Sequence, residues 1–151
     1  STLSRYGLDH AEAPVFIQSF EPDILMELSD RTALPLVQLV SLKRTAAGLT
    51  PNIPLEDLAQ YADVVGAMKW LLLTRQGQDA GFVAAAHDLN LKVHIWTIRD
   101  DAYRKEAFAS AEEEIDTFLR LGIDGFFTDF PDTGVAALDR MSSRGSDKPG
   151  E

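Results

Sequence analysis

Histidine is the side chain most often used for general acid–base catalysis near neutral pH, and this chain contains three. His10 precedes the first predicted strand, and His87 lies inside a predicted helix. His94 alternates with the apolar residues Val93 and Ile95 in another predicted strand. These surroundings favour a structural or solvated role for each histidine over a catalytic one.

Carboxylates could hold a metal ion, but their positions here indicate helix starts. Residues 112–114 are consecutive glutamates in the first turn of a predicted helix, where negative charge is favourable. Asp129 and Asp132 lie just before the next predicted helix, and we expect them to cap it. We therefore predict no catalytic and no metal-ligating residue in this chain.

A β-α-β unit accounts for residues 93–129. Residues 93–97 and 125–129 are short apolar runs bounded by turn signals, which predict two buried strands. Between them, Ser110 and Glu113 have the spacing of a capping box, and apolar residues follow at helical spacing. Two strands joined by such a helix are parallel.

The same alternation recurs upstream. Strands are predicted at 15–20 and 36–40, with a short strand or extended segment at 63–66. Helices are predicted from residue 22, at 54–61, 79–89 and 133–141, whereas 41–52 is predicted to be an irregular polar loop. About four parallel strands, or five with 63–66, alternate with helices, and this indicates an α/β fold.

Composition excludes several classes of partner. The formal net charge of −10, from 24 acidic and 14 basic residues, opposes binding to nucleic acids and to anionic lipid surfaces. The mean hydropathy is −0.10, and no long apolar run predicts a membrane span. The absence of cysteine excludes disulfides and fits either the cytosol or the periplasm.

Length indicates only part of a barrel. A (β/α)₈ barrel usually takes on the order of 250 residues, and 151 residues supply roughly half of one. We assign residues 1–141 to a partial TIM-barrel domain and 142–151 to a polar tail that we expect to be disordered.

Half a barrel exposes two strand edges and one wall of its interior. We therefore expect this chain to be part of a longer protein, and to pair with its missing half, pair with a copy of itself, or aggregate. Four apolar strand positions would lose interior partners: Phe16, Leu39, Val65 and Ile95.

Five segments carry a resemblance to a known family. They are VFIQSFEPDIL at 15–25, PLVQLV at 35–40, YADVVGAMK at 61–69, VHIWTIRDD at 93–101 and GIDGFFTDFPD at 122–132. In order and spacing they resemble the C-terminal half of the glycerophosphodiester phosphodiesterase family. The extended loop at 99–109 is more similar to the periplasmic bacterial members, which favours a periplasmic or secreted protein.

The resemblance implies metal-assisted hydrolysis of glycerophosphodiesters to glycerol 3-phosphate and an alcohol on a TIM barrel. In the family a divalent metal, usually calcium or magnesium, polarises the phosphoryl oxygens, and histidines act as acid and base. The family's His-Arg-Gly segment, its Glu-x-Asp metal pair and its later Glu belong to the first half of the barrel. None has a counterpart here, so we expect this chain alone to be inactive.

Because barrel active sites lie at the carboxyl ends of the strands, we look for substrate-binding residues at those positions. Phe20, Trp96 and Phe127 are predicted to form a pocket wall around the glycerol or the leaving alcohol, and an aromatic face would suit a choline or ethanolamine cation. Lys69 and Arg99 could contact phosphate at the barrel mouth. Alternatively, the aromatic residues fill interior layers and the basic residues are merely solvated.

Two other readings remain open. The chain could be a non-catalytic half-barrel module that assembles with itself or with a partner chain. A different phosphate-handling TIM barrel, such as an isomerase, would need a glycine-rich phosphate loop near the last strands, and Gly134 alone does not provide one.

Overall fold

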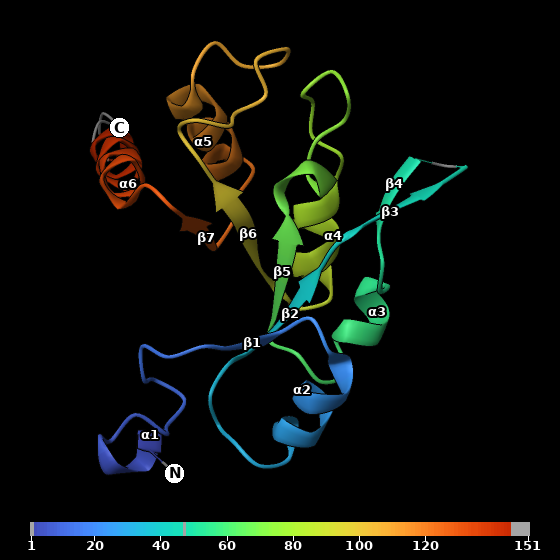
Figure 1. Ribbon diagram of the computed structural model, residues 1–151, viewed down its shortest axis with the longest axis vertical. Coiled ribbons are helices and arrows are strands. Elements are labelled where there is room, and N and C mark those ends of the chain that lie inside the picture. Colours follow the sequence, from blue (N-terminus) through green and yellow to red (C-terminus); the bar gives the residue numbers. More distant parts are fainter. Residues whose placement is uncertain (1, 47, 146–151) are drawn as a thin grey trace, which may run out of the picture.

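The structure is a computed structural model that describes residues 2–46 and 48–145 (Figure 1). Its elements in chain order are α1 (Thr2–Arg5), β1 (Ile17–Ser19), α2 (Pro22–Ser29), β2 (Leu36–Val40), β3 (Leu42–Thr45), β4 (Gly48–Pro51), α3 (Leu55–Leu58), β5 (Val64–Met68), the 3₁₀ turn η1 (Lys69–Leu71), α4 (Phe82–Asp88), β6 (Lys92–Ile98), α5 (Ala111–Arg120), β7 (Gly125–Thr128) and α6 (Pro131–Gly145).

A curled parallel sheet organises the chain. Its five strands have the order β1-β2-β5-β6-β7, and each neighbouring pair is parallel. Helices α3, α4 and α5 pack on the convex face (Figure 1) and contribute Leu58, Phe82 and Phe118 to the core. The predicted α/β fold, half of a TIM barrel with the segment at 63–66 as a full strand, is therefore confirmed.

The two-residue period of the strands assigns side chains to the two faces of the sheet. Val65 and Ile95 are fully buried in the core between sheet and helices. The prediction that they would lose partners is wrong, because these positions face the helices of this chain. Phe16 is 50% exposed, and it lies on the concave face as expected.

Strands β3 and β4 pair as an antiparallel hairpin, whereas an irregular loop was predicted at 41–52. Its register pairs Leu42 with Pro51 and Thr45 with Gly48. Asn52 closes the base, because its amide donates to the Ser41 carbonyl at 3.0 Å and its side chain accepts from the Ser41 amide at 2.8 Å. Pro51 is tolerated because it occupies the end of a two-stranded ribbon.

The predicted start of α5 is confirmed, but the end of α6 is not where the sequence placed it. Ser110 Oγ accepts from the Glu113 amide at 3.1 Å, as a capping box requires, and the Glu113 carboxylate accepts from the Ala109 amide at 2.7 Å. Helix α6 runs to Gly145, beyond the expected end near 141, so residues 142–145 of the expected tail are helical. The rest of that tail lies outside the described residues.

Two aspartates join neighbouring strands at their amino ends. Asp63, directly before β5, accepts from the Leu36 amide at 2.8 Å. Asp124, directly before β7, accepts from the Val93 amide at 2.8 Å and contacts His87 at 2.9 Å. Within the described residues, no helix is both long and apolar enough to cross a bilayer.

Candidate functional site

The carboxyl ends of the strands bring two of the predicted pocket residues together. Phe20, just after β1, and Trp96, in β6, are in edge-to-face contact with ring centroids 5.7 Å apart. Trp96 Nε1 also donates to the Gly66 carbonyl of β5 at 2.8 Å. Because β1 and β6 are separated by two strands, their side chains can meet only across the hollow of a curled sheet.

Glycine makes room for two other side chains of the concave face, those of Leu39 and His94. A Cβ atom at Gly66 would lie 2.5 Å from Leu39 Cδ2, and a Cβ atom at Gly125 would lie 2.7 Å from the His94 ring. Neither position has space for a side chain while its neighbour stays in place. The large residues of the concave face therefore depend on glycine in the adjoining strand.

His94 forms a second aromatic layer with Phe16 and Phe127. Its ring lies 5.1 Å from that of Phe16 and 6.2 Å from that of Phe127. These residues line a cavity of about 450 Å³ together with Gln18 and Gly125. Burial lowers the pKa of His94, so the ring is neutral at pH 7 and forms part of an aromatic wall.

Phe126 and Phe127 point to opposite faces, as predicted from the strand period. Phe126 packs against the core between sheet and helices, whereas Phe127 contacts His94 on the concave face. All three predicted aromatic residues, Phe20, Trp96 and Phe127, thus lie on one concave surface.

Lys69 lies away from this surface. It is buried in the turn η1, and its Nζ atom is 2.6 Å from Glu114 Oε2 of α5. Exposed fractions of 5% and 1% for the two side chains leave no access to a ligand. The expected phosphate contact of Lys69 has no support here, because its charge already has a buried partner.

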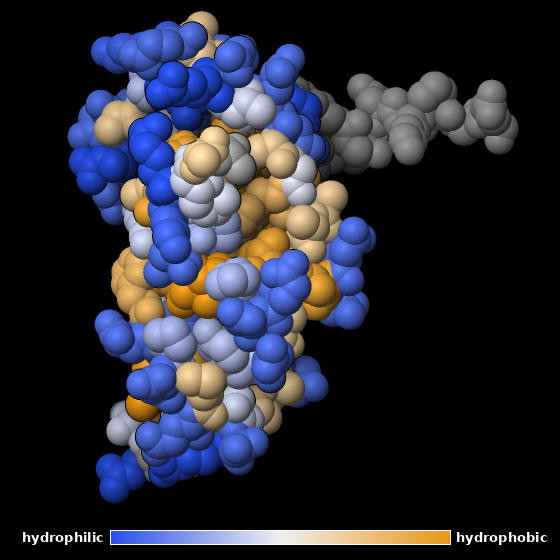
Figure 2. Space-filling view, turned by 90° about the vertical axis from the view of Figure 1, so that its right-hand side faces the viewer, coloured by the Kyte–Doolittle hydropathy of each residue, from blue (hydrophilic) through white to orange (hydrophobic). Residues whose placement is uncertain are grey.

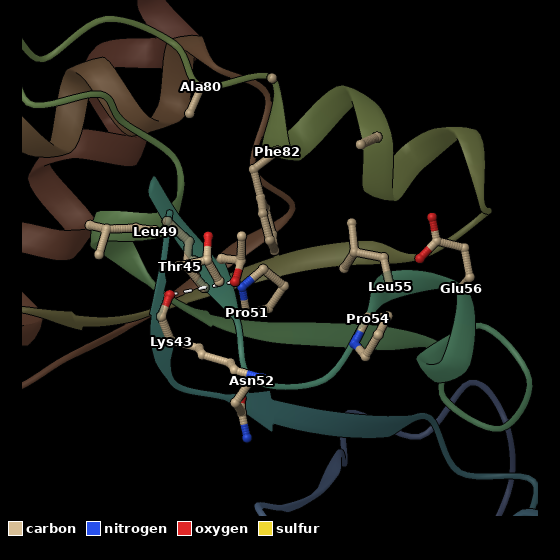
Figure 3. Close-up of a pocket in the computed structure, with 14 residues that line it drawn as sticks. Lys43, Thr45, Leu49, Pro51, Asn52, Pro54, Leu55, Glu56, Ala80 and Phe82 are labelled. Carbon is tan, nitrogen blue, oxygen red and sulfur yellow. Dashed lines mark hydrogen bonds between the residues drawn. The ribbon is translucent and has the colours of Figure 1, made fainter. Parts of the chain in front are cut away.

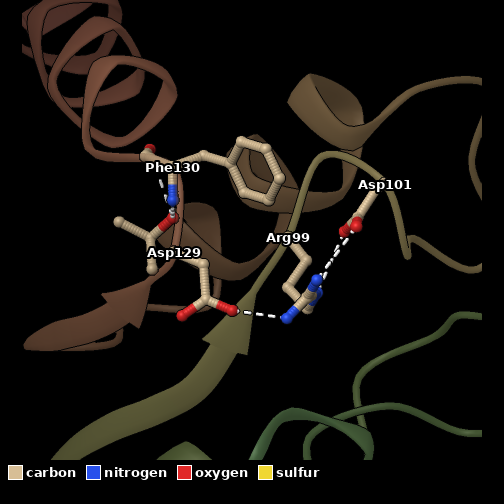
Figure 4. Close-up of polar contacts among 5 residues, drawn as sticks. Arg99, Asp101, Asp129 and Phe130 are labelled. Atoms are coloured by element: carbon tan, nitrogen blue, oxygen red, sulfur yellow. Dashed lines mark hydrogen bonds and ion pairs between the residues drawn. The ribbon is translucent and has the colours of Figure 1, made fainter.

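Arg99 is also engaged, at the carboxyl end of β6 (Figure 4). Its guanidinium donates to both Asp101 oxygens at 2.9 Å and to Asp129 at 2.5 Å. The hydrogen bond from Arg99 lowers the pKa of Asp101. Asp129 and Asp132 are not the helix caps that we expected, since Asp129 pairs with Arg99 and Asp132 lies inside the first turn of α6.

Gln38 has a role that the sequence did not reveal. Its buried side-chain amide donates to the carbonyls of Ser19 and Phe20 at 3.2 and 3.1 Å, and its oxygen accepts from the Tyr61 hydroxyl at 2.9 Å. It therefore fixes the end of β1, and with it the backbone of Phe20. A single amide in the apolar run of β2 is the sequence signal for such a role.

A separate groove of about 500 Å³ lies outside the half-barrel, between the hairpin and α4 (Figure 3). Phe82 of α4, Leu55 of α3 and Pro51 of β4 line it, with Lys43 and Glu56 as its charged residues. Figure 2 shows apolar side chains across the middle of this face, with hydrophilic residues above and below. The concave face is the better candidate site, because its paired rings of Phe20 and Trp96 lie at the carboxyl ends of the strands, where barrel active sites are built.

The described residues offer no metal site, since no three of their histidine, aspartate or glutamate side chains are grouped to hold an ion. The concave face therefore presents aromatic side chains, and the residues described here do not fit a metal ion.

Comparisons with known proteins agree with this geometry. Residues 2–133 match the glycerophosphoryl diester phosphodiesterase family. A glycerophosphodiester phosphodiesterase of Arabidopsis thaliana is 29% identical over an alignment of 155 positions that covers 85% of this chain and 41% of the plant protein. The glycerophosphodiester phosphodiesterase of Haemophilus influenzae is 27% identical over an alignment of 165 positions that covers 90% of this chain and 45% of the bacterial protein.

Solved structures show the same fold. A crystallised glycerophosphoryl diester phosphodiesterase homologue from Silicibacter pomeroyi superposes with a TM-score of 0.63 at 22% identity, covering 93% of this chain and 42% of its own. A homologue from Agrobacterium tumefaciens gives 0.62 at 19% identity, covering 93% and 49%. The chain spans less than half the length of each of these relatives. The match over residues 2–133 shows that this chain belongs to the glycerophosphoryl diester phosphodiesterase family.

Proposed function

We propose that this chain is the C-terminal part of a metal-dependent enzyme that hydrolyses glycerophosphodiesters to glycerol 3-phosphate and an alcohol. The observation that carries the proposal is the aromatic concave face at the carboxyl ends of the strands, in a chain of this family. Barrel enzymes build their active sites at that end.

The chain's own residues would bind and orient the substrate. Phe20 and Trp96 present two rings at a right angle, and Phe127 extends the wall toward His94. Such a wall would shield the alcohol from water and, for choline, would place aromatic faces beside a quaternary cation. Lys69 is left out of this role because its ion pair is buried.

The metal, calcium or magnesium, and the acid–base histidines would come from outside this chain. The partner that supplies them is the other half of the barrel, which would pair with the free edges of β1 and β7. The isolated chain would then be inactive. The extended loop after β6 supports a periplasmic or secreted location for the whole protein.

Hydrolysis of glycerophosphocholine tests the proposal. We would compare the purified chain, an upstream half-barrel from the same gene, and their mixture, each with about millimolar calcium or magnesium. Activity only in the mixture supports the proposal. Hydrolysis by the chain alone would contradict the prediction that it lacks catalytic groups. The absence of hydrolysis by a correctly assembled mixture would refute the proposed enzymatic function.

A matched pair of variants tests the pocket wall. Trp96→Ala removes the ring and its hydrogen bond to Gly66, whereas Trp96→Phe keeps an aromatic ring on the concave face. We expect Trp96→Ala to lower kcat/KM of the mixture about 10-fold or more, and Trp96→Phe to lower it less. If both variants kept the kcat/KM of the wild-type mixture, Trp96 would not be part of the substrate site.

A self-assembling module is the second candidate function. It is favoured by the exposure of Phe16 and Phe20, 50% and 51%, on a face with two open strand edges. Light scattering distinguishes this candidate from the enzyme, since a self-assembling module should form an oligomer of defined size without the upstream half. A monomer that associates only with that half favours the enzyme.

A further inference from the structure

The loops that follow β5 and β6 meet at a buried cluster of charges outside the aromatic wall. Lys69 of η1 and Glu114 of α5 are 2.6 Å apart, with exposed fractions of 5% and 1%. They are separated by 45 positions in the sequence. Their contact therefore links the turn after β5 to the helix that follows β6.

The same carboxylate also holds the middle of the loop at 99–110. Glu114 Oε1 accepts from the Arg104 backbone amide at 3.2 Å, while Oε2 contacts Lys69. One carboxylate thus joins three segments of the chain. Replacing it would release the Arg104 amide and leave the Lys69 charge buried without its partner.

Trp70 completes the cluster. Lys69 Nζ and Arg104 Cζ both lie 4.5 Å from the centroid of its ring. Arg104 Nη1 also donates to the Thr74 carbonyl at 3.1 Å. Cation–π contacts and hydrogen bonds therefore fix the long loop against the segment at 69–74.

Buried ion pairs are poor stabilisers, because desolvation of both charges offsets most of their attraction. The presence of this cluster is better explained by its holding the loop at 99–110 in one conformation. The loop that it holds begins at Arg99, which pairs with Asp129 after β7. The loop is thus tied at Arg99 and at Arg104, on the side of the sheet where the pocket wall ends.

We propose that Lys69, Glu114, Arg104 and Trp70 form a positioning clamp that holds the loop at 99–110 against η1 and so shapes the mouth of the substrate site. The role in substrate binding rests on the proposed function, whereas the clamping of the loop does not. Glu114 is a positioning residue that acts through Arg104.

Limited trypsin digestion of Glu114→Gln tests the clamp, because the loop contains the cleavable residues Arg99, Arg104 and Lys105. The control is Asp116→Asn, which weakens another ion pair of α5, with Arg140 at 3.0 Å. We expect cleavage after Arg104 or Lys105 to be about 10-fold faster in Glu114→Gln, relative to the rest of the chain, and unchanged in Asp116→Asn. Equal loop cleavage in wild type and Glu114→Gln would overturn the proposal.

Tryptophan fluorescence gives a second readout that is independent of hydrolysis. The chain has two tryptophans, and Trp96→Phe leaves Trp70 as the reporter. We expect Glu114→Gln to shift the Trp70 emission in this background and Asp116→Asn to leave it unchanged. If Glu114→Gln does not fold, the pair Lys69→Met with Glu114→Met removes both buried charges. A protected loop in that double variant would contradict the clamp.

Kinetics of the assembled enzyme separate positioning from chemistry. We expect Glu114→Gln to raise KM for glycerophosphocholine at least about 5-fold and to change kcat less than about 2-fold, since the clamp shapes a binding wall. A fall in kcat at unchanged KM would contradict the role in substrate binding. An inactive wild-type mixture would refute the proposed function, while the digestion and fluorescence results would still decide the clamp.

Discussion

At the scale of single residues, the chemistry of a side chain depended on its partners. Lys69 and Arg99 are both basic residues after strand ends, and both are committed to carboxylates, one buried and one exposed. The surroundings of His94 likewise disfavour a role for it in acid–base catalysis. Its ring packs between Phe16 and Phe127, and burial lowers its pKa.

His94 should make folding stability sensitive to pH. Because its pKa is lowered from the ordinary 6.5 in the folded state, the unfolded chain binds the proton more readily. Stability is therefore complete above pH 6.5 and falls as pH decreases through 6.5 toward the folded pKa. Urea unfolding at about pH 7.5 and about pH 5.5 should show a larger loss for wild type than for His94→Gln. Equal losses would show that His94 is not the group responsible.

The glycine beside His94 gives a second prediction. Gly125→Ala should lower the free energy of unfolding by about 1–3 kcal/mol, because its Cβ would lie 2.7 Å from the His94 ring. His94→Ala should remove most of that added cost, since it removes the ring. A double-mutant cycle measured by urea unfolding checks this, and additive effects would argue against the contact.

At the scale of elements, two of the β/α units use the same kind of hydrogen bond, from a backbone amide to an aspartate side chain, to join neighbouring strands. Asp63 precedes β5 and Asp124 precedes β7, and each accepts from a backbone amide at the start of the neighbouring strand. Burial alone would raise the pKa of Asp124, but the Val93 amide and His87 hold it below its ordinary value. An aspartate directly before an apolar strand is the sequence signal of this hydrogen bond.

Removing either carboxylate should weaken the sheet at its amino end. We expect Asp124→Asn to cost about 1–3 kcal/mol, because the charge-assisted hydrogen bond to Val93 and the contact with His87 are both weakened. Asp88→Asn, on the same helix as His87, should change stability by less than about 0.5 kcal/mol. Thermal or urea unfolding measures both, and equal effects would contradict the role of Asp124.

At the scale of the whole molecule, the described chain is an open half of a barrel with its aromatic face uncovered. The helices cover most of the convex side, where Val65 and Ile95 are fully buried, but the concave side leaves Phe16 50% and Phe20 51% exposed. The strands β1 and β7 lie at the two edges of the sheet. This arrangement matches a chain that spans less than half of its relatives.

The uncovered face should dominate association of the isolated chain. Phe16→Gln with Phe20→Gln should reduce self-association at micromolar concentration, because it removes exposed apolar area on the concave face. Tyr6→Gln is the control, since Tyr6 is 75% exposed and directly follows α1, a helix that lies away from the sheet (Figure 1). Sedimentation velocity measures both variants, and equal association of the double variant and wild type would place the contact elsewhere.

Local patterns in the chain were enough for the α/β class, the order of the parallel strands and their helices, and the cap of α5, since periodicity, turn residues and capping act between near neighbours. They missed the hairpin β3–β4. The quoted motifs were also enough for the family. The burial of Lys69, the pairing of Arg99 with Asp129 and the facing of Val65 toward the helices were not predictable from them. These features depend on how the sheet curls and which loops meet at its end, and such contacts join residues far apart in the sequence.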